Sequence, residues 1–261
     1  MNNLIDSVKR TFGQARPQAQ QLTRAQARKL ILERIGPLLK REGFVHRKGN
    51  NLWRITEHKT DVIELRFLTL EEHQQFKIPQ STFSINYGCY YHFIPDIYEG
   101  KFTHQIPELI TPLEAVCHYR MQATRSIKQK PKKMDMGAWH LDETEERQQL
   151  VLNDVIKQLE SEVFLALNRL MDINEWVRFL VEEEGNLGTG KKDSLIRHFL
   201  LSFTYKSIND TDKSKTHLLV AKKICEKIID KRSKHPEHLQ LQPDSDFYKY
   251  LGLLNKSLSQ Q

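Results

Sequence analysis

The sequence predicts an α+β fold in which an antiparallel sheet of four to five strands, covered by helices, is followed by an all-helical C-terminal half. Two observations predict it. Across residues 44–125 apolar and polar residues alternate with a period of two, which is typical of half-buried strands. After Trp139 the period changes to about 3.6, which indicates helices. The 12 Phe, 8 Tyr and 3 Trp among 261 residues are enough to build a core.

A first helix is predicted from Thr23, and we expect it to cover one face of the sheet. Gly36 and Pro37 lie inside this helix, so it is kinked there or restarts with Pro37 as its first residue. Gly43 is placed to end it in a left-handed conformation. The apolar stripe consists of Ala27, Leu30, Ile31, Ile35, Leu38 and Leu39.

The predicted strands follow this helix. Residues 44–48 and 52–58 flank Gly49-Asn50-Asn51, whose residue types tolerate positive φ, so this segment predicts a hairpin. Alternation predicts further strands at 62–70, 82–92 and 117–124. The stretch between the last two is punctuated by Pro95, Pro107 and Pro112, and it is interpreted as a long loop.

Helical periodicity organises the C-terminal half. We expect a long helix at 143–171, a second helix ending at Gly185, an αα-hairpin near 194–232 and a last helix from about 246 to 258. The predicted organisation is a polar N-terminal arm (1–20), an α+β domain (21–185, with its sheet at 44–125) and a helical extension (186–261).

Composition narrows the class of protein. No run approaches the roughly 18 apolar residues of a membrane span, and the first residues lack the apolar core of a signal peptide. Cys89, Cys117 and Cys225 are few and scattered, which favours a reducing, cytoplasmic setting without disulfides. We therefore expect a cytoplasmic protein with no membrane contact.

The net charge of +7 is uneven along the chain. Residues 1–50 have a balance of +8 and residues 201–261 one of +4. The segment 125–133 has five cations and no acid, so it can neutralise phosphates, although a solvated loop has the same composition. The cations of this basic segment are Arg125, Lys128, Lys130, Lys132 and Lys133.

Motifs for nucleotides, metals and catalysis are weak. Residues 185–192 have the glycine and lysine spacing of a P-loop, but Lys192 stands where a Ser or Thr hydroxyl is needed, so a linker between helices is the better interpretation. Cys89 and His92 should face opposite sides of a strand, as should Cys117 and His118, which disfavours a metal site and a Cys–His pair. We expect no cofactor, no metal and no catalytic constellation.

One face of the sheet is the remaining candidate site. Polar and aromatic residues lie opposite the apolar ones in two strands, and others can join them depending on register. Arginine forks with aromatic walls suit an acidic peptide, a phosphate or a carboxylate. An ordinary solvated face, or a polar network that seats the long helix, explains the pattern equally well. The candidate residues are Asn86, Tyr90, His118 and Arg120, with Arg54, Arg66 and Trp139 as additions.

Three short motifs also resemble the bacterial domain-of-unknown-function 4304 family over about residues 25–180. They are Gly43-Phe44 with the basic hairpin and Trp53-Arg54, then the segment 83–88 (FSINYG), then Cys117-His118-Tyr119-Arg120 followed by Trp139 and Asp142. The resemblance implies a bacterial, soluble α+β domain and no established activity. Gln122 stands where the family often has a second Arg, and Ala138 where a second Trp is common, so a ligand bound by that Arg is not implied.

These observations lead to a ranked set of functions. The first is a non-enzymatic interaction protein that binds a protein partner, such as an immunity or antitoxin-type protein or a defence-system subunit. The alternative is a nucleic-acid-binding protein that uses the basic arm and residues 125–133. The third is an enzyme of unknown reaction centred on His118 and Arg120.

Overall fold

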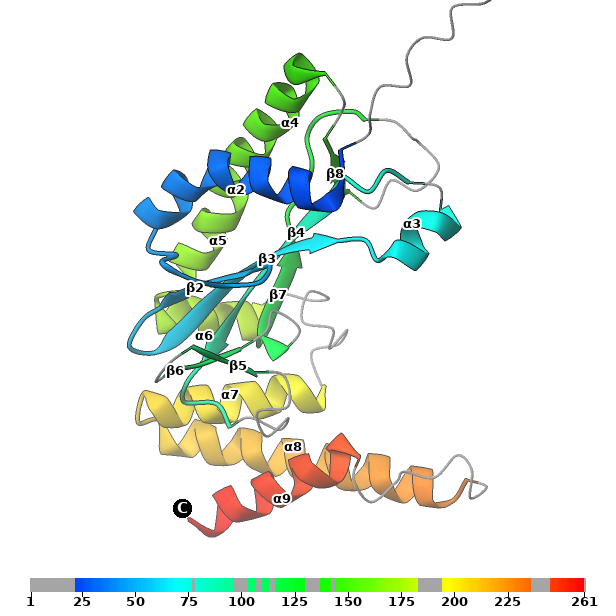
Figure 1. Cartoon of the computed structure of the whole chain (residues 1–261). Helices are drawn as coiled ribbons and strands as arrows, with labels where there is room; N and C mark the ends of the chain where they lie inside the picture. The colour runs from blue at the N-terminus through cyan, green and yellow to red at the C-terminus, as the bar shows by residue number, and fades with distance from the viewer. Residues whose placement is uncertain are drawn as a thin grey trace, which may run out of the picture. The chain divides into compact units, whose positions relative to one another are not determined.

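The computed structural model describes residues 22–76, 78–95, 103–106, 109–112, 116–129, 137–141, 144–182, 194–235 and 245–260 (Figure 1). It has the predicted α+β fold, with an antiparallel sheet and an all-helical C-terminal half. Within the described residues, none of the helices combines the length and apolarity that a membrane span requires. The predicted arm at 1–20, the P-loop-like segment 185–192 and the predicted boundary at 185–186 lie outside the described residues.

The chain forms two compact units that interleave along the sequence. The first unit contains residues 1–37, 67–84 and 125–157, and the second contains 38–66, 85–124 and 158–261. Their boundaries fall within helix α2 (Arg24–Arg41), strands β3 (Lys59–Phe67) and β4 (Thr82–Tyr91), and helix α4 (Glu145–Gln158). Each unit therefore combines segments that are far apart in the sequence.

Helix α2 occupies the range predicted for the first helix. Its buried side is the predicted apolar stripe, with Ala27, Ile31 and Ile35 fully buried. The helix continues through Pro37 as one element. Gly43 follows it with a φ of +86°, which is the left-handed ending that the sequence predicts.

The main sheet has the strand order β1-β2-β3-β4-β7. Strands β1 (His46–Lys48) and β2 (Asn51–Ile55) form the predicted hairpin around Gly49, whose φ is +62°. Strand β7 (Tyr119–Gln122) pairs antiparallel with β4 and lies at the edge of the sheet. Gly88 is required there, because a Cβ at this position would clash with the carbonyl oxygen of Tyr119.

Short elements were missed. Strands β5 (Thr103–Ile106) and β6 (Leu109–Pro112) pair with each other inside the stretch interpreted as a long loop, so that interpretation is wrong for these residues. Helix α3 (Leu70–Phe76) and the two-residue strand β8 (Trp139–His140), which pairs with β4, were not predicted. Such elements are too short to establish a period.

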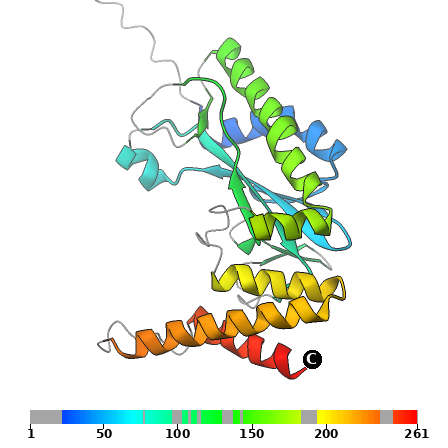
Figure 2. The same ribbon diagram turned by 180° about the vertical axis from the view of Figure 1, so that it is seen from behind.

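Three helical segments of the second unit cover one face of its sheet. They are the π-helix η3 (Leu159–Val163), α5 (Phe164–Arg169) and α6 (Ile173–Glu182). The continuous run α4–η3–α5 occupies the range of the predicted long helix. Figure 2 shows yellow-green α6 in front of the strands, and Figure 1 shows it behind them. Aromatic contacts fill this layer, namely Phe44 with Phe164, Tyr91 with Trp176 and Tyr119 with Phe179.

Helices α7 (Leu195–Ser207), α8 (Thr211–Ser233) and α9 (Asp246–Ser259) continue the second unit. Ser194 caps α7 and Asp210 caps α8, each by accepting a backbone N–H of the first turn. The αα-hairpin turns at Asn209, which has a φ of +62°. The Trp176 indole N–H donates to the Thr204 hydroxyl (3.1 Å), so α7 is joined directly to α6.

Candidate functional site

The register of β4 and β7 places four predicted site residues on one face. Gly88 lies opposite Arg120 and Asn86 opposite Gln122, while Cys89 lies opposite Tyr119 on the other face. The His118 N–H donates to the Cys89 carbonyl (2.9 Å), which continues the pairing beyond the strand. The alternation in the sequence therefore placed Asn86, Tyr90, His118 and Arg120 together correctly. We call these four residues the polar face.

Three residues of the polar face are engaged in contacts within the fold. The Asn86 amide reaches the Glu64 carboxylate of β3 (3.4 Å). The Tyr90 ring stacks on the His118 ring with centroids 4.5 Å apart. Tyr90 also packs on a buried cluster made of Trp53, Val62 and Cys117. Arg120 is the exposed member of the four. Asn86 is therefore buried, and Tyr90 and His118 are partly buried.

His118 is held as a neutral ring. Its Nδ1 accepts the backbone N–H of Tyr91 (2.9 Å), which places the proton of the neutral imidazole on Nε2. Burial, together with the nearby His92, lowers the pKa of His118 from 6.5 to about 3. A group that stays neutral throughout the physiological range is poorly matched to proton transfer near neutral pH. Its geometry gives it a structural role in fixing the end of β4.

Arg54 lies on the opposite face of the sheet, so the structure does not bring it to the polar face. It stands opposite Asp61 in the β2–β3 register. Its Nη2 lies 2.7 Å and its Nε 2.8 Å from Asp61 Oδ2. The Lys59 ammonium lies 2.7 Å from the other oxygen, Oδ1. We call Arg54, Lys59 and Asp61 the buried charge cluster.

The buried charge cluster is closed by backbone and amide groups. Arg54 donates to the Asn168 side-chain oxygen (2.7 Å) and to the Glu42 carbonyl (3.3 Å), and Lys59 donates to the Leu167 carbonyl (2.7 Å). The two carbonyls belong to the C-terminal ends of α2 and α5, where helix dipoles are negative. These ends offset the one positive charge that Asp61 leaves unbalanced. This cluster was not predicted, because the predicted strand begins at residue 62, although Lys59 and Asp61 share a face of β3.

The remaining candidates behave differently. Trp139, in the first unit, is fully buried, stacks on Phe83 and donates its indole N–H to Asp154 (2.8 Å). Arg66 is exposed on β3.

The predicted basic segment is described only in part. Arg125, also in the first unit, donates to the Ala138 carbonyl (2.7 Å), whereas Lys128 is exposed. Lys130, Lys132 and Lys133 lie outside the described residues.

Among the described residues, the structure assembles neither a metal site nor a reactive thiol. Across the part of the chain that the structure describes, no three His, Cys, Asp or Glu side chains are placed to share a metal ion. All three cysteines are buried thiols. Burial raises the pKa of Cys89 to about 12, which keeps the thiol protonated and unreactive at neutral pH.

Comparisons of the chain with protein-family models, with curated proteins and with solved structures gave no match.

Proposed function

We propose that this protein is a non-enzymatic binding protein that acts through a protein partner. One observation carries the proposal: the side chains best suited to chemistry are committed to the fold. Arg54 and Asp61 neutralise each other under α5, and His118 is a partly buried neutral ring that accepts the Tyr91 N–H. Because these side chains stabilise the fold, they support a scaffold that binds its partner through its exposed surface.

The outer side of α5 and α6 is the surface that we expect the partner to contact. Leu165 and Val181 are exposed to 66% and 47% there, and Met171, in the turn between the helices, to 46%. The opposite side of these helices packs on the sheet through Phe164, Trp176 and Phe179. The surface is therefore presented on a rigid layer, which limits the entropy lost on binding.

The finer form of this proposal is an immunity or antitoxin-type protein, or a defence-system subunit, of a bacterium. Its support is the resemblance of residues 25–180 to the domain-of-unknown-function 4304 family, which stays a prediction. The adjacent genes test it, because a toxin gene beside this one favours the first form and an unrelated operon counts against it.

Purification of the tagged full chain from native extract tests the binding function. We expect a stoichiometric protein partner on gel filtration with light scattering, and we expect the L165E/V181E variant to lose it. The matched control L70E/L150E changes two similarly exposed leucines of the first unit and should retain the partner. A monomer of 30.8 kDa without a partner, both in extract and with the products of neighbouring genes, overturns the proposal.

Nucleic-acid binding through the N-terminal arm and residues 125–133 remains the alternative. In this segment Arg125 already donates to the Ala138 carbonyl, which leaves Lys128 as the exposed cation among its described residues. If the alternative is correct, replacing Lys128, Lys130, Lys132 and Lys133 by Gln should abolish salt-sensitive binding. An enzyme centred on His118 and Arg120 would instead lose turnover in H118A.

A further inference from the structure

The helical extension contains an excess of positive charge. Its described residues, 194–235 and 245–260, include twelve Lys and Arg against five Asp and Glu, a balance of +7. Seven of these cations lie on α8, together with three of the acids. The charge is therefore concentrated on one 23-residue helix.

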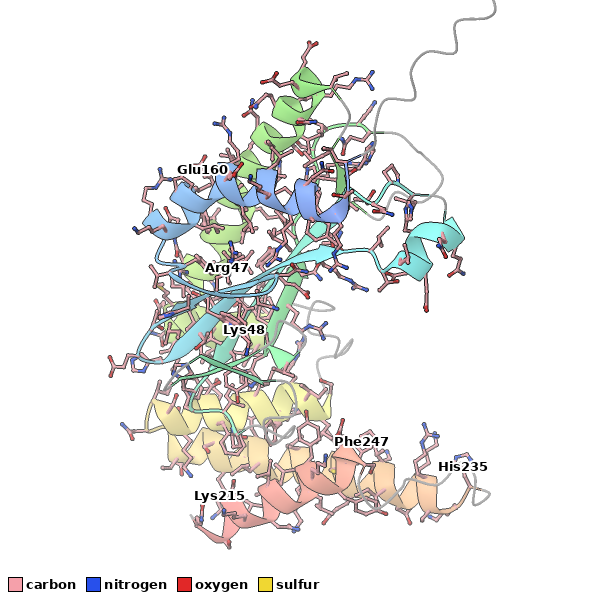
Figure 3. The ribbon with its side chains drawn as sticks, viewed as in Figure 1. Arg47, Lys48, Glu160, Lys215, His235 and Phe247 are labelled. Carbon is pink, nitrogen blue, oxygen red and sulfur yellow. The ribbon has the colours of Figure 1, made fainter. Side chains whose placement is uncertain are left out.

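Four lysines of α8 lie on one ridge of the helix. Every fourth residue from Lys215 reads Lys215, Leu219, Lys223, Lys227 and Lys231, and all five are exposed. Residues four apart are neighbours on a helix surface. We call Lys215, Lys223, Lys227 and Lys231 the lysine row. Figure 3 labels Lys215 near the start of α8 and His235 beyond its end.

None of the four lysines of the row forms an ion pair with an acid among the described residues, although α8 also contains Asp212, Glu226 and Asp230. Glu226 is paired with Lys222 (3.7 Å) and Asp230 with Lys234 (2.7 Å), so these two acids are taken by other lysines. Mutual repulsion within the row adds to its attraction for a polyanion.

The opposite side of α8 shows which polyanion fits. Leu218, Ala221 and Cys225 are buried there, where α8 packs on α7 and α9. A helix that lies on a membrane needs an apolar face to insert, and α8 has already buried its own. A partner that presents phosphates and no apolar surface suits this helix better.

We propose that the lysine row of α8 binds the phosphate backbone of a nucleic acid. Each step of four residues turns about 40° around the helix axis, so Lys223, Lys227 and Lys231 share one face, while Lys215 points about 80° away from Lys223. These three lysines span eight residue steps, or about 12 Å, over which one strand of a DNA duplex presents about four phosphates. Ammonium groups bind phosphates as point charges and do not read base edges in the way that bidentate arginines do, so binding is independent of sequence. The row shares no residue with the surface proposed for the protein partner.

Fluorescence anisotropy with a labelled 20-base-pair duplex and the full chain tests this proposal across 25–200 mM NaCl. The variant K223Q/K227Q/K231Q should bind at least tenfold more weakly at 50 mM NaCl. Its slope of log K against log salt should be shallower by about 3, since each lost phosphate contact removes about 0.9. The control K40Q/K206Q/K256Q loses the same charge from exposed lysines off the row, and we expect a loss of less than threefold.

Any of four outcomes would overturn the proposal. The first is that the wild-type chain fails to bind the duplex at 50 mM NaCl. The second is that the control weakens binding as much as the row variant, which would make net charge the cause. The third is that the K128Q/K130Q/K132Q/K133Q variant loses binding while the row variant retains it. The fourth is that vesicles with 30% phosphatidylserine capture the chain through the row while the duplex does not. Circular dichroism of each variant confirms that it is folded.

Discussion

The buried charge cluster and the lysine row use the same residue type in opposite ways. Lys59 is 2% exposed and is held by a carboxylate and a helix carbonyl. Lys223, Lys227 and Lys231 are exposed on α8 and pair with no described acid. A buried ion must be paired, because removing its partner leaves an uncompensated charge. An exposed lysine contributes little to folding, so its charge is available for binding.

The largest expected effect tests the buried member of this comparison. The substitution D61N leaves Arg54 and Lys59 without their carboxylate, and we expect it to lower the free energy of unfolding by about 3–5 kcal/mol. Urea titration followed by circular dichroism measures this. The control D230N removes the partner of exposed Lys234 and should cost under about 0.5 kcal/mol. Equal losses in the two variants would remove the distinction between the regions.

Two glycines, one in a buried close contact and one in open space, provide a second comparison that does not involve charge. G88A places a Cβ against the Tyr119 carbonyl and the Cys117 side chain, and overpacking at a buried backbone contact should cost about 2–3 kcal/mol. Gly252 lies inside α9 with open space around it, so G252A should stabilise by about 0.5–1 kcal/mol. Thermal unfolding of both variants measures this, and a neutral G88A would contradict the observed pairing of β4 with β7.

A third prediction concerns a partly buried and an exposed histidine. The pKa of His118 is lowered from 6.5 in the unfolded chain to about 3, so folding favours the neutral ring over the protonated one. This stability is present above pH 6.5 and is lost as the pH falls toward 3. Between pH 6.5 and 4.5 the loss should be about 2 kcal/mol.

The control for this pH effect is a pair of variants. H118N keeps an acceptor for the Tyr91 N–H but does not titrate, so its unfolding free energy should fall less steeply over this range. H58N changes an exposed ring and should follow the wild type. Parallel curves for H118N and the wild type would show that His118 is not the titrating group.

The smallest expected effect on stability tests the exposed lysine row. K223Q/K227Q/K231Q should change the free energy of unfolding by less than about 0.5 kcal/mol, because these side chains have no partner to lose among the described residues. Denaturant midpoints measure it. A loss above 1 kcal/mol would mean that the lysine row has a structural role. Weaker DNA binding by the same variant could then reflect a damaged fold.

Long periodic segments made the fold predictable, and short or register-dependent features did not. Alternation over ten residues fixed the faces of β4 and so grouped Asn86 with Tyr90. The four-residue strands β5 and β6 contain only two periods each. Arg54 could not be assigned to a face from sequence, because its position depends on which residue of β3 stands opposite it. That residue is Asp61, and the pairing moved Arg54 from the candidate site to the interior.

The buried charge cluster also constrains the order in which the chain can fold. Arg54 meets Asn168 across 114 residues of sequence, and Lys59 meets the Leu167 carbonyl across 108. During synthesis, the β2–β3 hairpin therefore leaves the ribosome long before the groups that close its cluster. Contacts this distant in sequence form slowly, because loop closure must precede them. The hairpin thus completes its burial only when α5 arrives, which makes the arrival of α5 a late, committing step in the folding of the second unit.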